Sequence, residues 1–301
     1  NFAGGQKDWR AIQRFLRWYF YTHDQRLRWV CLLGDASIDY RNQFGTQPGL
    51  GIYDFIPTEL VSPWPSYFAW VSISAPYTTD DTLVALDAPP FDRPQLDTPD
   101  LAVGRIPAAT LAQAEAMVAR AVMYAEDPPG GAWRNNVLMS ADDLHRPSGG
   151  SPSWREEDHI LQSERLVTYR IPTSVDVDKV YMVDYPLIGL YKPDARRDLL
   201  GALNEGTTLF YYVGHGAAVT LADEQLFQIT DIAGLNNGDR RFVFMAFSCD
   251  VGVYADPSSQ CMAEDFLTAT QGGGIASVAA SWVSLSSAND AFSGELFGAY
   301  F

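Results

Sequence analysis

Residues 207–216 read TTLFYYVGHG, and the order of these residues is the best indication of the fold class. Its first seven residues carry no charge and are aromatic, branched or threonine, which is typical of a strand inside a parallel sheet. Gly214, His215 and Gly216 follow directly. Ligands and reactive groups gather at the carboxyl ends of strands in such sheets, so this strand would deliver an imidazole to a functional edge.

A second strand with a reactive end is expected at residues 241–247, because Ser248, Cys249 and Asp250 follow this apolar run. Positions 215 and 249 are 34 residues apart (249 − 215), which leaves room for a crossover connection and a whole strand. If the two strands are parallel neighbours, their ends meet at one edge of the sheet. The sequence therefore predicts that His215 and Cys249 lie close together.

Strands and helices alternate through the second half of the chain. Strands are expected at 136–140, 179–183, 207–213, 241–247 and 274–279, with helices at 155–169, 194–203, 260–269 and from 289 onward. This alternation implies right-handed crossovers, and hence an α/β fold with a mainly parallel sheet covered by helices on both faces.

The first half of the chain has fewer regular elements. Helices are expected at 8–21 and 111–126, strands at 29–34 and 101–105, and short strands at 68–73 and 83–86 within a Pro-, Gly- and Asp-rich region, 40–99. A Pro-Pro-Gly-Gly stretch at 128–131 marks the best internal boundary. We therefore expect an N-terminal subdomain with long loops over 1–130 and a C-terminal subdomain over 131–301.

Composition and charge argue against a protein that binds nucleic acid or spans a membrane. The 301 residues are 47% hydrophobic, and the net charge of −16 repels nucleic-acid phosphates and anionic lipid heads. No apolar run approaches the roughly 20 residues that a membrane-spanning helix needs. The chain begins with Asn1 and ends at Phe301 inside a helix-like run, so we expect it to be part of a longer protein with further domains.

Cysteine and histidine at neighbouring strand ends favour nucleophilic chemistry. A free thiol has a pKa near about 8.5, and an adjacent imidazole can lower it and later protonate a leaving amine. Gly216 lets the backbone approach a substrate closely, so its N–H and that of Cys249 can face a developing oxyanion. The structural alternatives are a histidine in a turn and a buried thiol at a strand end.

The other cysteines and histidines make no second pair by their spacing. Cys31 is expected inside a strand as a small core residue, and Cys261 as a structural thiol at the start of a helix. His23 is expected at an exposed helix end, His145 in a loop, and His159 beside the cleft. No C-x-x-C or H-x-x-x-H spacing supports zinc.

The order of these motifs resembles the gingipain-type cysteine peptidases over nearly the whole chain, and is most similar to the sortase branch of the type IX secretion system. The matching strings are LLGDASIDY (32–40), YDFIPT (53–58), TDDT (79–82), PDLAVGRIP (99–107), GHG (214–216), SCDVGVY (248–254), CMAE (261–264) and GGGIA (272–276). The resemblance implies a caspase-like three-layer α/β/α sandwich in two packed subdomains.

The same resemblance implies the roles of several residues. Cys249 would be the nucleophile, His215 the general base and acid, and the N–H groups of Gly216 and Cys249 the oxyanion hole. Asp142 occupies the place of an orienting carboxylate, where family members carry Glu; Asp142 and Asp143 alternatively cap a loop or bind an ion.

Substrate recognition and metal binding are expected on the same basis. Asp158 lies nearest the place where Arg-cleaving relatives hold the substrate guanidinium, and Trp282 would wall that pocket; a solvated helix start and a core tryptophan are the alternatives. The chemistry needs no cofactor. Structural Ca²⁺ is expected on Asp-rich segments, including 79–81, 92–100 and 250–256; the alternative is that their charge serves only solubility.

Three hypotheses follow. The first is a secreted or cell-surface bacterial cysteine endopeptidase that acts on protein or peptide substrates, including those with basic residues, through a thioester on Cys249. The second is a type IX secretion sortase in which an amine, rather than water, resolves the same thioester. The third is an inert gingipain-like module of a surface protein used for adhesion or assembly.

Overall fold

A computed structural model of the chain describes Phe2, Gly4, Gly5 and residues 7–40, 54–61, 77–87, 98–143 and 157–301. Contacts divide the chain into two compact units. Unit 1 comprises Asn1–Met117 together with Tyr254–Gln260, and unit 2 comprises Val118–Val253 and Cys261–Phe301. The boundary expected near residue 130 stays a prediction.

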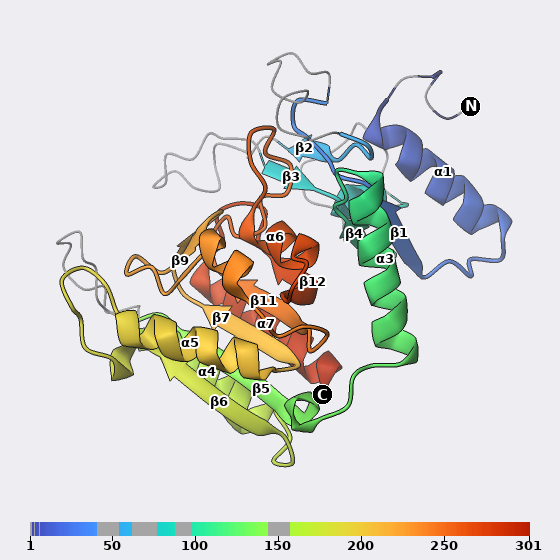
Figure 1. Cartoon of the computed structure of the whole chain (residues 1–301). Coiled ribbons are helices and arrows are strands. Elements are labelled where there is room, and N and C mark those ends of the chain that lie inside the picture. The colour runs from blue at the N-terminus through green and yellow to red at the C-terminus, as the bar shows by residue number, and fades with distance from the viewer. Residues whose placement is uncertain are drawn as a thin grey trace. The chain divides into compact units, whose positions relative to one another are not determined.

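Unit 2 is built on a five-stranded sheet in which every pairing is parallel, and this confirms the expected α/β class. The strand order is β12-β11-β7-β5-β6 (Figure 1). The strands are β5 (Asn136–Ala141), β6 (Asp176–Tyr181), β7 (Leu209–Val213), β11 (Phe242–Phe247) and β12 (Gly274–Ala279). All five residues of β7, the central strand, are buried, as its uncharged sequence predicts.

Helices cover both faces of this sheet, so unit 2 has three layers: helices, sheet and helices. On one face α5 (Pro193–Glu205) and α6 (Met262–Thr268) pack against alternate strand residues such as Phe210 and Phe244. On the other face α4 (Glu157–Tyr169) and α7 (Ser286–Tyr300) pack against the intervening residues, such as Tyr211. Because strand side chains alternate between faces, both cores need apolar residues, which explains the nearly continuous apolar strands.

The connection that follows β7 forms a small antiparallel sheet, for which the sequence analysis has no predicted strands. Its strands are β8 (Gly216–Ala217), β9 (Thr220–Leu221) and β10 (Phe227–Gln228), and the 3₁₀ helix η4 (Ile229–Gly234) follows. Strands of two residues give no alternation pattern long enough to be recognised in a sequence.

Unit 1 contains two small sheets and an amphipathic helix, α1 (Trp9–Thr22). The strands β1 (Trp29–Leu33) and β4 (Ala102–Ile106) pair in parallel, and β2 (Glu59–Val61) pairs antiparallel with β3 (Tyr77–Thr79). The short strand expected at 83–86 is wrong, because the chain there turns through the 3₁₀ helix η1 (Asp81–Leu83); the strand expected at 68–73 lies outside the described residues. Three elements of the chain remain: α3 (Leu111–Glu126), which crosses from unit 1 into unit 2, and the 3₁₀ helices η2 (Ala132–Asn135) and η3 (Met182–Asp184) of unit 2.

The expected burial of Cys31 is also wrong, since its side chain is exposed. Along β1, residues 29, 31 and 33 are exposed whereas Leu32 is buried. This strand is therefore covered on one face only, and Cys31 lies on the other.

Among the described residues, no helix combines the length and the apolar character that crossing a bilayer requires.

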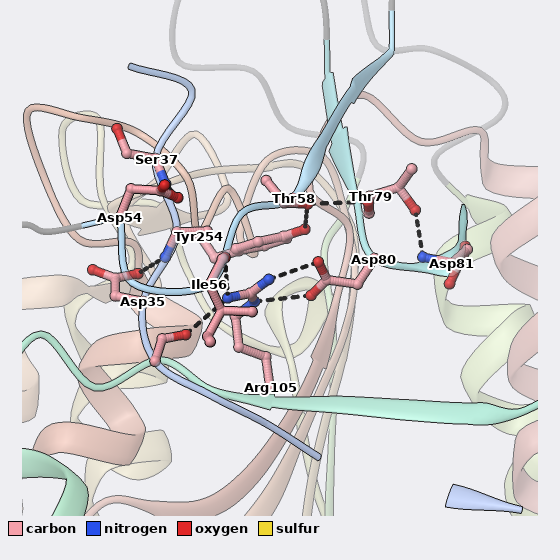
Figure 2. Close-up of polar contacts among 12 residues, drawn as sticks. Asp35, Ser37, Asp54, Ile56, Thr58, Thr79, Asp80, Asp81, Arg105 and Tyr254 are labelled. Carbon is pink, nitrogen blue, oxygen red and sulfur yellow. Dashed lines mark hydrogen bonds and ion pairs between the residues drawn. The ribbon is translucent and has the colours of Figure 1, made fainter. Parts of the chain in front are cut away.

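A buried polar network holds the loops of unit 1 together around Arg105 (Figure 2). The guanidinium, 7% exposed, makes a two-bond contact with Asp80 at 2.7 and 2.8 Å. It also donates to the carbonyl oxygens of Gly34 and Ile56 and lies 5.3 Å from the ring centre of Tyr254. The Tyr254 hydroxyl is 2.8 Å from that of Thr58, so residues distant in sequence meet at one cation.

We predict that Arg105→Ala lowers the free energy of unfolding by about 3 kcal/mol, because it leaves the largely covered Asp80 carboxylate, 13% exposed, without its partner. Arg197 provides a matched control, since its ion pairs with Asp194 and Asp198 leave its side chain 66% exposed. Arg197→Ala should change stability by less than about 1 kcal/mol. Urea titration measures both variants, and equal losses would contradict the assigned role of Arg105.

Candidate active site

Three parallel strands of unit 2 end in one row. Val213, the last residue of β7, pairs with Ala141 of β5 on one side and with Phe247 of β11 on the other. The residues that leave the sheet directly after this row are therefore neighbours: Asp142 after β5, Gly214-His215-Gly216 after β7, and Ser248-Cys249 after β11. The predicted meeting of the two reactive strand ends at one edge follows from this register.

Asp142 fixes the main chain of the His215 loop. Its Oδ2 accepts the His215 N–H at 2.9 Å, and its Oδ1 accepts the Asp143 N–H at 2.9 Å. Gly214 makes this approach possible, because a Cβ atom there would lie 2.3 Å from the Asp142 Cβ. Its φ of +155° also strains any other residue. The glycine before His215 therefore admits the carboxylate.

His215 is half-buried and firmly held by its backbone. Its carbonyl oxygen accepts the Tyr212 hydroxyl at 2.6 Å and the Ala222 N–H at 2.9 Å. Its ring meets the ring of His159 edge to face, with centroids 5.8 Å apart and planes at 85°. His159 comes from the first turn of α4 and is 8% exposed, so a second imidazole borders the first.

The loops that carry His215 and Cys249 touch at Gly216. A Cβ atom at this position would lie 2.2 Å from the Ser248 Oγ and 3.0 Å from a Val251 methyl. Gly216 directly follows His215, and Ser248 directly precedes Cys249, so the close approach of Gly216 to Ser248 brings the two loops together. Any side chain at position 216 would separate them.

Cys249 is half-buried, and its sulfur lies against the segment that precedes α7. The sulfur accepts the Ser284 N–H at 3.4 Å and lies 3.6 Å from the Ser284 carbonyl oxygen. The next residue, Asp250, has a φ of +58° and donates its N–H to the Trp282 carbonyl oxygen at 3.1 Å. This left-handed residue turns the chain sharply away from the strand after the thiol.

The two residues expected to recognise substrate lie on different elements. Asp158 is exposed in the first turn of α4, and Trp282 is half-buried in the segment after β12. The Ser- and Gly-rich loop at 148–153, which precedes Asp158, lies outside the described residues, as does His145. A shared pocket for Asp158 and Trp282 remains a prediction.

Buried carboxylates gather behind the His215 loop. Burial raises the pKa of Asp142 well above its ordinary value, and it raises the pKa of Glu224 to about 7. Asp143 forms an ion pair with Lys192, and the side chains of both are less than 10% exposed. The expected alternative role for Asp142 and Asp143, ion binding, therefore concerns a site that also contains Glu224.

Sequence reasoning missed Glu224 and Ser284, and it did not foresee the contact between the rings of His159 and His215. Glu224 follows His215 by nine positions (224 − 215) in a connection with no recognisable pattern. Ser284 contributes only backbone atoms to the Cys249 sulfur, so its identity carries no signal. His159 comes from a helix whose position against the strand end no local spacing reveals.

Cys261, His23 and the described acidic residue Asp80 have surroundings of their own in the structure. Cys261 is buried at the N-terminus of α6, where its N–H donates to the Glu264 carboxylate at 2.9 Å, as expected of a structural thiol. His23 is exposed at the end of α1. Asp80 is occupied by Arg105, and residues 92–97 lie outside the described residues.

Comparisons with solved structures identify related folds. A complex of the pro- and mature domains of Porphyromonas gingivalis RgpB matches with a TM-score of 0.59 and 18% identity, over 93% of this chain and 56% of that one. The Arg-specific cysteine proteinase gingipain R matches with a TM-score of 0.60 and 18% identity, over 91% and 53%. A third structure, described as a protease, matches with a TM-score of 0.66 and 16% identity, over 97% and 54%.

The chain thus spans about half the length of the solved proteins that it matches. Because the sequence identities are low, these structural similarities establish the fold alone. A comparison with curated protein sequences found no significant match. The match to a sequence family is more extensive, because it runs from residue 1 to residue 301. The chain belongs to peptidase family C25, the gingipain family of cysteine peptidases.

Proposed function

We propose that the chain carries the catalytic centre of a cysteine endopeptidase, with Cys249 as nucleophile and His215 as general base and acid. The observation that carries this proposal is the register of β5, β7 and β11, whose common last row precedes Asp142, His215 and Cys249. The contact of Gly216 with Ser248 supports it, because the imidazole and thiol loops meet there.

In this mechanism His215 takes the proton of Cys249, and the thiolate attacks the carbonyl carbon of the scissile peptide bond. The resulting tetrahedral oxyanion accepts hydrogen bonds from the N–H groups of Gly216 and Cys249. Its collapse breaks the C–N bond, the imidazolium gives its proton to the leaving amine, and a thioester remains. Water, deprotonated by His215, then attacks the thioester and restores the thiol.

Asp142 has a positioning role in this proposal. It accepts the backbone N–H of His215, so it fixes the loop from which the imidazole projects. Asp143 and Glu224 surround it and help to determine its charge. This role differs from that of a carboxylate that holds the imidazole N–H, and it predicts a smaller effect on removal.

The substrates, partners and location of the whole protein belong to the proposal as well. Protein or peptide substrates follow from a peptidase site, and a net charge of −16 favours those with basic residues. We place the protein outside the cytoplasm, at the bacterial surface or secreted, with further domains in the same chain. An amine acceptor in place of water would make the same site a sortase.

We predict that Cys249→Ala lowers the rate of peptide hydrolysis at least about 10³-fold, because the nucleophile is lost. Cys31→Ser is the matched control: Cys31 is an exposed thiol in unit 1, and its replacement should leave the rate unchanged. The assay uses a peptide library under reducing conditions. Equal rates for Cys249→Ala and the unmodified chain would refute the assigned nucleophile, and an added amine that diverts product into a new amide would identify transfer.

We predict that Asp142→Asn lowers kcat about 10- to 100-fold with little change in KM, because the His215 loop loses a carboxylate acceptor but keeps its other hydrogen bonds. Steady-state kinetics measures the two constants. Circular dichroism confirms that the variant is folded. An unchanged kcat in a folded variant would show that Asp142 does not position His215.

We predict that Asp158→Asn lowers kcat/KM for peptides with Arg at the cleaved position about 10- to 100-fold, with a smaller effect on uncharged peptides. Asp127, an exposed residue beyond the end of α3, provides a matched control, since Asp127→Asn should leave the preference unchanged. A library profile measures both variants. An unmodified chain with no preference for Arg would remove Asp158 from the pocket.

A further inference from the structure

Three hydrogen bonds fix the main chain of His215 without fixing the plane of its ring. Asp142 accepts the His215 N–H, and the His215 carbonyl oxygen accepts the Tyr212 hydroxyl and the Ala222 N–H. A histidine side chain rotates about two further torsions, and the second, between a tetrahedral and a planar carbon, has broad minima. The plane of the imidazole is therefore set by what the ring itself touches.

The ring of His159 lies against the ring of His215. Their centroids are 5.8 Å apart and their planes meet at 85°. Aromatic pairs prefer this edge-to-face arrangement at centroid separations of about 4.5–7 Å. Rotation of the His215 ring about its second torsion would break the arrangement, so the contact restricts the plane of the imidazole.

His159 can act in this way because α4 holds it firmly. It is the third residue of that helix and is 8% exposed. One turn further on, the buried Ser163 hydroxyl lies 3.0 Å from the Tyr181 hydroxyl, at the end of β6. Leu166 packs into the core between α4 and the sheet. A side chain on an anchored helix keeps its place more precisely than one on a loop.

The same helix also reaches the segment against which the thiol lies. Gln162 follows His159 by three positions (162 − 159), so the two side chains are neighbours on α4. The Gln162 Nε2 donates to the Ser286 hydroxyl at 2.7 Å. Two residues earlier, the Ser284 N–H donates to the Cys249 sulfur at 3.4 Å. One helix therefore contacts the imidazole through His159 and the segment beside the sulfur through Gln162.

We propose that His159 is a positioning residue of the candidate active site, and that its ring fixes the plane of the His215 imidazole. The catalytic consequence rests on the proposed function, whereas the restriction of the ring does not. Proton transfer from Cys249 requires an imidazole nitrogen directed at the thiol, so a freely turning ring would spend less time in the productive geometry. Loss of His159 should therefore lower kcat and leave KM nearly unchanged.

Kinetics of two replacements tests this role. His159→Ala removes the ring and should lower kcat about 3- to 10-fold, the effect of one lost aromatic pair. His159→Phe restores an edge and a face without a ring nitrogen, so its kcat should stay within about twofold of that of the unmodified chain. Equal losses of kcat in the two variants would overturn the proposal, as would an unchanged kcat in folded His159→Ala.

A matched control separates positioning from general stability. Leu166→Val removes part of a buried side chain seven positions further along α4 (166 − 159). It should lower the melting temperature and leave kcat unchanged. Thermal unfolding measures the stability of all three variants. A loss of kcat in Leu166→Val as large as that in His159→Ala would show that any weakening of α4 suffices, and would overturn the specific role of His159.

Nuclear magnetic resonance tests the ring contact without any assay of activity. The chain has four histidines, so ¹³C labelling of histidine rings gives few signals, and single replacements assign them. The order parameter of the His215 ring should be near about 0.85 in the unmodified chain and in His159→Phe, and below about 0.6 in His159→Ala. Equal order in all three would overturn the proposal even where Cys249→Ala is inactive. The expected order parameters together with a fully active Cys249→Ala would support the positioning role and refute the proposed nucleophile.

Discussion

The hydrogen-bonded register of β5, β7 and β11 is the constraint on which the candidate site depends. Parallel pairing places Ala141, Val213 and Phe247 in one row, so the three strands end at the same level of the sheet. A shift by one residue would turn every side chain of a strand to the opposite face and bury the wrong set. The two apolar cores on either side of the sheet therefore stabilise the fold and also align the reactive groups.

The loops at this edge depend on close backbone approach. Gly214 admits Asp142 to the His215 backbone, and Gly216 admits Ser248. The sequence GHG is thus a packing requirement as much as a chemical motif. The same packing has an electrostatic cost, because burial disfavours the ionised forms of Asp142 and Glu224 and raises their pKa values.

Much of this arrangement is predictable from sequence, and the failures have physical causes. The strands that precede His215 and Cys249 are predictable because uncharged runs end abruptly in Gly-His-Gly and Ser-Cys-Asp. Glu224 is not, since its direction depends on a turn with two left-handed residues. Cys31 fails for another reason: a short apolar run does not reveal whether a strand is covered on one face or on both.

The segment Tyr254–Gln260 has a consequence for the order of folding. It belongs to unit 1 by its contacts, although it is made after nearly all of the large sheet of unit 2. The hydroxyls of Thr58 and Tyr254 that meet in the Arg105 network are 196 positions apart. During vectorial synthesis unit 1 therefore emerges first, but its last segment is made only after β5, β6, β7 and β11 of unit 2.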